Sequence, residues 1–162
     1  MSFRIVDSII GSQGIHETDT VQHHPLGQVV SAVDPVYGAG EFIYLKGAAN
    51  TAIGSVALYA PDDWSTSLLV ANDIGSVSFA MAANVADQYG WYQIKGKAVA
   101  KAGTVVDGAL VYATATPGQL DDAVVAGDRV KNAKFASADG TPSAGLAEIE
   151  IDRPFVDDGS AA

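Results

Sequence analysis

Short segments in which apolar and polar residues alternate, each ended by Gly, Pro, Asp or Asn, are the feature that most constrains the fold of this chain. They begin after Pro25 and recur to within a few residues of the C-terminus. This spacing is typical of β-sandwiches and small β-barrels, in which short strands are joined by tight turns. The pattern predicts an all-β domain, a small β-barrel or β-sandwich with little helix.

The clearest alternation lies in Tyr92–Lys101. There Ile94, Gly96, Ala98 and Ala100 face one way, while Gln93 and three lysines face the other. The other predicted strands are Gln28–Val33, Glu41–Leu45, Ser55–Tyr59, Ser76–Met81, Leu110–Ala115 and Glu148–Asp152. The apolar run Glu41–Leu45 is expected to be buried on both faces. Helical spacing occurs only in Phe79–Tyr89 and Asp121–Lys131, and both also fit a strand followed by a turn.

Three parts follow from this pattern. Residues 1–26 show no sustained period and predict an extended N-terminal arm, residues 27–156 form the β-rich domain, and residues 157–162 form a short acidic tail. The arm carries the apolar run Phe3, Ile5, Val6, Ile9 and Ile10. This run either docks on a neighbouring protein or forms the first strand of the core, and we favour docking.

Charge and composition restrict the partners. Only 17% of the residues are charged, which indicates that copies of the chain or a partner cover part of the surface. The formal net charge of −10 and the scattered basic residues argue against nucleic acid. We find no apolar run long enough to span a bilayer and no secretory signal pattern, so we expect a cytoplasmic, soluble chain. The absence of cysteine excludes disulfides and thiolate metal sites.

The residues with catalytic or metal-binding chemistry do not form a convincing site. His16, His23 and His24 accompany Glu17 and Asp19 in the predicted arm, where a scaffold and supporting partners for a metal are missing. We interpret them as solvated arm residues. There is no G-x-S-x-G motif, and the carboxylate pairs coincide with turns or the tail: Asp62-Asp63, Asp121-Asp122 and Asp157-Asp158. We therefore expect no enzyme activity, no metal and no cofactor.

Aromatic and small residues supply two further hypotheses. Trp64 lies in a turn-like stretch, and Gly96, Ala98 and Ala100 offer a strand face that another backbone can approach closely. Together these four residues are our candidate subunit interface. Trp91 and Tyr92 are best explained as core, although with Trp64 they could form the sugar-contacting surface of a carbohydrate-binding β-sandwich.

Four segments resemble the head decoration, or capsid cement, proteins of tailed bacteriophages. They are Gly40–Gly47 (GEFIYLKG), Gln88–Ile94 (QYGWYQI), Asp121–Ala133 (DDAVVAGDRVKNA) and Gly140–Glu148 (GTPSAGLAE). These are packing and turn segments that cover much of the chain after residue 26 and carry no catalytic signature.

The resemblance implies a virion structural protein on the outer surface of the phage head, made in the host cytoplasm. Such proteins bind the major capsid protein, often as homotrimers, and clamp neighbouring subunits of the expanded icosahedral head. We expect the apolar run of residues 3–10 to make the capsid contact by adding a strand to an exposed sheet edge. Another virion component, such as a tail or head-fibre protein, is the alternative within this class.

Overall fold

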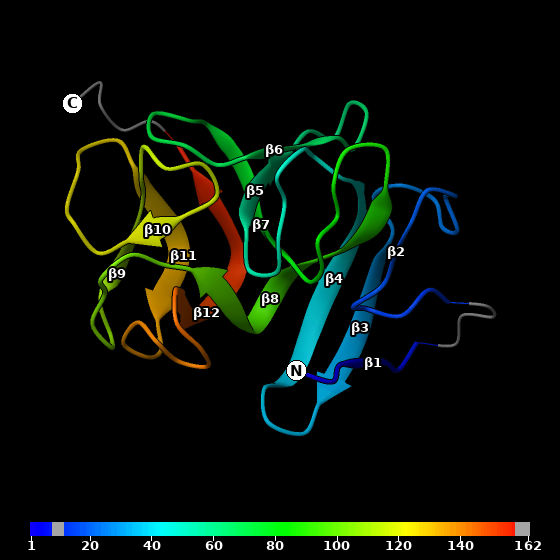
Figure 1. Cartoon of the computed structure of the whole chain (residues 1–162), viewed down its shortest axis with the longest axis horizontal. Coiled ribbons are helices and arrows are strands. Elements are labelled where there is room, and N and C mark those ends of the chain that lie inside the picture. Colours follow the sequence, from blue (N-terminus) through cyan, green and yellow to red (C-terminus); the bar gives the residue numbers. More distant parts are fainter. Residues whose placement is uncertain (8–11, 158–162) are drawn as a thin grey trace.

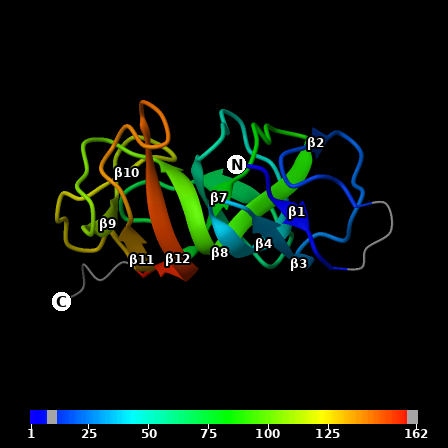
Figure 2. The ribbon, with the colours of Figure 1, turned by 90° about the horizontal axis from the view of Figure 1, so that it is seen from below.

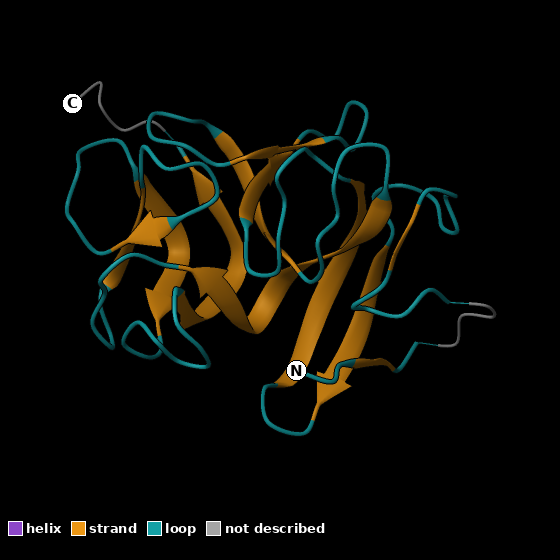
Figure 3. Ribbon diagram, in the orientation of Figure 1, coloured by secondary structure: helices purple, strands orange, loops and turns teal. Residues whose placement is uncertain are grey.

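The predicted strands form an antiparallel sheet. The computed structural model describes residues 1–7 and 12–157, and in these residues it contains strands and loops but no helix (Figures 1 and 3). The strands are β1 (Arg4–Ile5), β2 (Thr18–Asp19), β3 (Val29–Asp34), β4 (Gly38–Lys46), β5 (Val56–Tyr59), β6 (Thr66–Leu68), β7 (Gly75–Ala80), β8 (Tyr89–Lys101), β9 (Leu110–Ala113), β10 (Leu120–Asp121), β11 (Arg129–Phe135) and β12 (Leu146–Val156). The all-β class is confirmed, whereas the narrower choice of barrel or sandwich stays a prediction.

The sheet has one main path. Its strand order is β1-β3-β4-β8-β7-β12-β11-β9-β10, and the short strand β2 pairs with β8 while β5 joins β6 to β7. β8 pairs also with β12, so β7, β8 and β12 each contact the two others. β1 and β10 are the two ends of the path, and they lie at opposite sides of the molecule (Figures 1 and 2).

A bend in β8 allows this long strand to pair with two different parts of the sheet. Its first half pairs with β4 and its second half with β12. At the bend, Gly96 has φ of 103°, and a Cβ there would lie 2.5 Å from the carbonyl oxygen of Ala39. Only glycine combines this backbone conformation with so close an approach. The close approach expected from the small residues therefore occurs, but the neighbouring backbone is β4 of the same chain.

Three apolar clusters fill the interior. β4 contributes to two of them, because Phe42 and Tyr44 point to one face while Ile43 and Leu45 point to the other. This confirms that the strand is buried on both faces. The third cluster lies beyond the bend, between the second half of β8 and strands β7, β9, β10, β11 and β12, and includes Phe135.

β11 is the longest strand that the alternation did not predict. Its sequence overlaps Asp121–Lys131, where the apolar spacing also fits a helix. The strand forms because it lies between β9 and β12 and pairs with both. A bulge at Asn132, whose φ is 58°, interrupts the register and with it the period of two.

We predict that Gly96→Ala destabilises the protein by about 3 kcal/mol, because the new Cβ meets the Ala39 carbonyl and the backbone is in a region that alanine avoids. Urea unfolding at neutral pH measures the difference. The matched control is Gly103→Ala, where the nearest atom to an added Cβ is 3.6 Å away, and we expect almost no change. Equal losses for both variants would contradict the account of the bend.

Candidate functional site

The N-terminal residues cover one face of the sheet instead of protruding from it. Phe3 is 5% exposed and Ile15 is 2% exposed, and both belong to the cluster formed by β3, β4 and β8. The rings of Phe3 and Phe42 meet edge to face at 4.9 Å. The expectation of an extended arm is wrong for residues 1–7 and 12–26, because this apolar face of the sheet needs a cover and the N-terminal residues provide it.

Gln13 attaches the second part of the N-terminal region, residues 12–26, to the sheet. Its backbone N–H donates to Nε2 of His24 at 3.0 Å, and its carbonyl oxygen accepts from the indole N–H of Trp91 at 3.0 Å. The Tyr44 hydroxyl donates to its side-chain oxygen at 2.6 Å, and its side-chain amide donates to two backbone carbonyls. Since buried polar groups are costly without partners, this network determines where the segment lies.

Asp34 attaches the first part of the N-terminal region, residues 1–7, to the sheet. Its carboxylate accepts hydrogen bonds from the backbone N–H of Ser2, of Val36 at 2.7 Å and of Tyr37 at 2.8 Å. Burial by itself would raise the pKa of Asp34, but the bonds from these three N–H groups outweigh it and lower the pKa to about 2. The carboxylate thus connects the N-terminus to the β3–β4 turn.

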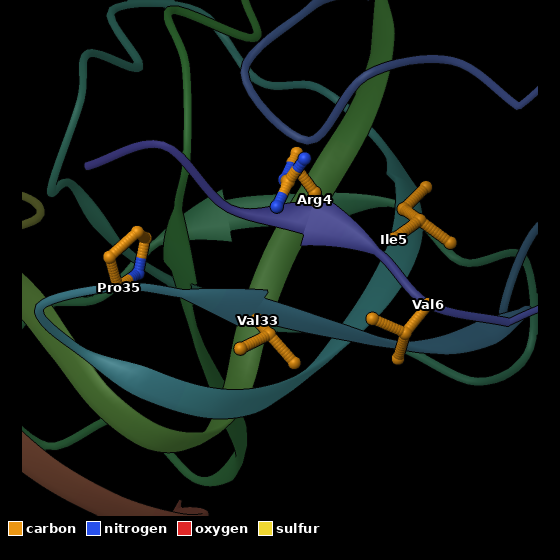
Figure 4. Close-up of a pocket in the computed structure, with 5 residues that line it drawn as sticks. All are labelled: Arg4, Ile5, Val6, Val33 and Pro35. Carbon is orange, nitrogen blue, oxygen red and sulfur yellow. The ribbon is translucent and has the colours of Figure 1, made fainter.

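Between these anchors, the edge of the sheet at β1 presents an apolar groove. The groove has a volume of about 280 Å³ and is lined by Arg4, Ile5, Val6, Val33 and Pro35 (Figure 4). Val6 is 59% exposed and Val33 is 42% exposed. β1 pairs with β3 on one side, and no other strand of the described residues pairs with its second side. An apolar groove beside a free strand edge is the best candidate site for a protein partner.

The five residues predicted to contact the capsid do not share one environment. Ile5 and Val6 line the groove. The capsid contact predicted for Phe3 is wrong, because its side chain is buried in the chain's own core. Ile9 and Ile10 lie outside the described residues. The sequence offered no signal that Val33 and Pro35 would join the groove, since that follows from the pairing of β1 with β3.

The structure does not bring the four predicted interface residues together. Ala98 and Ala100 are fully buried in the cluster beyond the bend, so the predicted interface is wrong at these two positions. Gly96 is partly exposed and lies against β4 of the same chain. Trp64 is partly buried, stacks on Tyr59 with ring centroids 6.4 Å apart, and packs over Gly27. It closes a core cluster of its own chain and retains only a partly exposed edge.

The surface proposed for sugar binding is not available. Trp91 is 1% exposed and Tyr92 is 0% exposed, and they point to opposite faces of β8. Neither ring can stack on a sugar, which removes two of the three residues of the carbohydrate-binding alternative. Their interpretation as core is confirmed.

The three histidines have separate surroundings. His16 places Nδ1 3.1 Å from the carbonyl oxygen of Met81, His23 pairs with Asp19 at 2.8 Å, and His24 is buried. The interpretation of His24 as a solvated residue is therefore wrong. In the part of the chain that the structure describes, no three His, Asp or Glu side chains are placed to hold one metal ion.

Most of the basic side chains are paired with carboxylates. The pairs are Lys46–Asp87, Lys95–Glu41, Lys95–Asp152, Lys97–Glu148, Lys131–Asp157, Lys134–Glu150 and Arg153–Glu41. Since the chain carries 19 acidic and nine basic residues, the surface has an excess of carboxylates. Arg4 is the charged residue in the lining of the groove.

Comparison with models of known protein families and with curated protein sequences finds no match to this chain. Among residues 1–7 and 12–157, no helix could span a bilayer.

We predict that Asp34→Ala lowers the free energy of unfolding by roughly 2 kcal/mol at neutral pH, since the shift of its pKa from 3.8 to about 2 measures the interactions lost. The folded pKa lies below the unfolded one, so this stability is present above pH 4 and disappears as the pH falls towards 2. Chemical denaturation across this range should show a flatter pH dependence for the variant. Asp62→Asn, at an exposed turn, is the control and should behave as the unaltered protein.

Proposed function

We propose that this protein is a bacteriophage head decoration protein that binds the major capsid protein through the groove at the β1 edge. The resemblance of four sequence segments supports the phage assignment. The groove at β1 and β3 supports the mode of contact, because it combines apolar side chains with a strand that, among residues 1–7 and 12–157, has a partner on one side only.

Strand addition is the mechanism that this edge favours. The backbone of a capsid segment would pair with the free side of β1, and its alternate side chains would enter the groove beside Val6 and Val33. Main-chain hydrogen bonds supply affinity that depends little on sequence, while the groove selects apolar side chains. Because many copies bind one lattice, a weak individual contact is enough to hold neighbouring subunits together.

The distribution of charge supports a protein partner in place of nucleic acid. Phosphate binding needs clustered cations that are free to replace counterions. Here six basic side chains lie in ion pairs, and carboxylates outnumber cations on the chain. A head protein of this charge would not adhere to DNA, which suits a position on the outer surface of the virion. The proposed role is mechanical, without catalysis or a cofactor.

The homotrimer belongs to the same proposal. The low fraction of charged residues supports it, but the small-residue face no longer does, because Ala98 and Ala100 are buried within the chain. Light scattering of the purified protein should give the mass of three chains. A monomer at every accessible concentration would contradict the trimer without affecting the capsid contact.

We expect the full chain to co-sediment saturably with undecorated, expanded phage heads. The double variant Val6→Asp/Val33→Asp should bind at least about ten-fold more weakly, because it replaces two apolar side chains of the groove with carboxylates that binding would have to desolvate. Deletion of residues 1–26 is unsuitable, since it would remove Phe3 and Ile15 from the core.

Val124→Asp is the matched control, because Val124 is 81% exposed and lies in the loop between β10 and β11, beyond the bend in β8. It should bind as the unaltered chain does. Failure of the full chain to bind heads would overturn the proposal and favour a tail or head-fibre protein. Equal binding by the groove variant and the control would leave decoration standing but reject the groove as its site.

A further inference from the structure

The segment of residues 12–24, which we term the strap, crosses the ends of β4 and β8 on the face that it covers (Figure 1). Its strand β2 pairs with β8 through only two residues, Thr18 with Gly90 and Asp19 with Tyr89. Its attachment therefore depends strongly on the side-chain network around Gln13 and on the burial of Ile15.

His24 must be neutral in this network. Its Nε2 accepts the hydrogen bond from the Gln13 backbone N–H, so the nitrogen cannot carry a proton while the bond exists. The ring packs against Tyr44 and Trp91 with centroids 5.1 and 5.2 Å away. If Nε2 carried a proton, its N–H would face the Gln13 N–H, and two hydrogen-bond donors would meet in a buried site without an acceptor between them.

His16 makes a different contact within the strap. Its Nδ1 lies 3.1 Å from the carbonyl oxygen of Met81 and must donate to it. Its Nε2 is buried and has no hydrogen-bond partner among the described residues. The ring lies beside Phe3, with centroids 6.4 Å apart. The bond to the Met81 carbonyl and the contact with Phe3 thus hold the ring on the sheet.

The charged groups around the strap do not compensate a proton on His24. Tyr44 faces it from β4 and Trp91 from β8, while Tyr89 lies nearby on β8. On the strap itself, Asp19 is engaged with His23, and the Glu17 carboxylate accepts from the backbone N–H of Gly14. Burial, followed by the charge of His23, lowers the pKa of His24 from its ordinary value of 6.5.

We infer that the strap is an acid-released latch: protonation of His24 detaches residues 12–24 from β4 and β8 and exposes Tyr44 and Trp91 while the remaining sheet stays folded. The remaining sheet does not use these bonds, because the cluster beyond the bend and the opposite face of β4 are formed by other residues. This inference is independent of the proposed decoration function.

The direction of the pH effect follows from the two states. The closed strap binds fewer protons than the open strap, so closure is fully favoured above pH 6.5 and weakens as the pH falls below it. For one histidine, the ratio of open to closed strap rises by up to about ten-fold per pH unit until the pKa of the closed state is reached. Asp34 titrates only near pH 2, so its effect is separate.

Trp91 provides the readout, in a Trp64→Phe background that leaves it as the single tryptophan. We expect a reversible red shift of its fluorescence between pH 6.5 and 4.5, with unchanged far-ultraviolet circular dichroism. Adding His24→Gln should move the midpoint down by at least about one pH unit, since glutamine can accept from the Gln13 N–H and does not titrate there. His23→Gln is the matched control and should keep the transition, because the Gln13 N–H still has His24 Nε2 as its acceptor.

Hydrogen exchange in the unaltered protein tests the same inference without substitutions. The Gln13 amide should lose protection as the pH falls from 7 to 5, after correction for intrinsic exchange, while the Val130 amide of β11 keeps its protection. The inference is overturned if the Gln13 amide remains protected, if both amides lose protection together, or if the fluorescence transition survives His24→Gln without a shift.

Discussion

The contact between Gly96 of β8 and the Ala39 carbonyl of β4 is the constraint on which the architecture depends. It places the bend that lets one strand pair first with β4 and then with β12. Without that bend, one strand could not contribute both to the cluster beyond the bend and to the two clusters that lie on opposite faces of β4. A single position without a Cβ thus joins the two regions of the sheet.

The N-terminal residues have two roles that depend on one another. They cover an apolar face through Phe3 and Ile15, and they present the groove at the sheet edge through Ile5 and Val6. A free arm would have to become ordered when it binds a partner, at a cost in conformational entropy. Here Asp34 on one side and the Gln13 network on the other hold the edge in place before any partner arrives.

The two anchors respond to acid in different ranges. The Asp34 carboxylate needs its charge to hold Ser2, whereas His24 needs to be neutral to hold Gln13. The strap is consequently the part of the cover that mild acid affects first, while the β1 edge keeps its attachment. The groove and the strap are both formed by the N-terminal region, but their stability is controlled by separate groups.

The sequence by itself determined the all-β class, the approximate limits of seven strands and the burial of Glu41–Leu45 on both faces, because alternation and turn residues are local properties of the chain. Only the tertiary structure decided which surfaces meet. It buried Ala98, Ala100 and Phe3 within the chain, paired β11 despite its irregular period, and enclosed His24. A period of two shows that a strand has an inner face, but the element that covers this face comes from a distant part of the chain, and no local pattern records it.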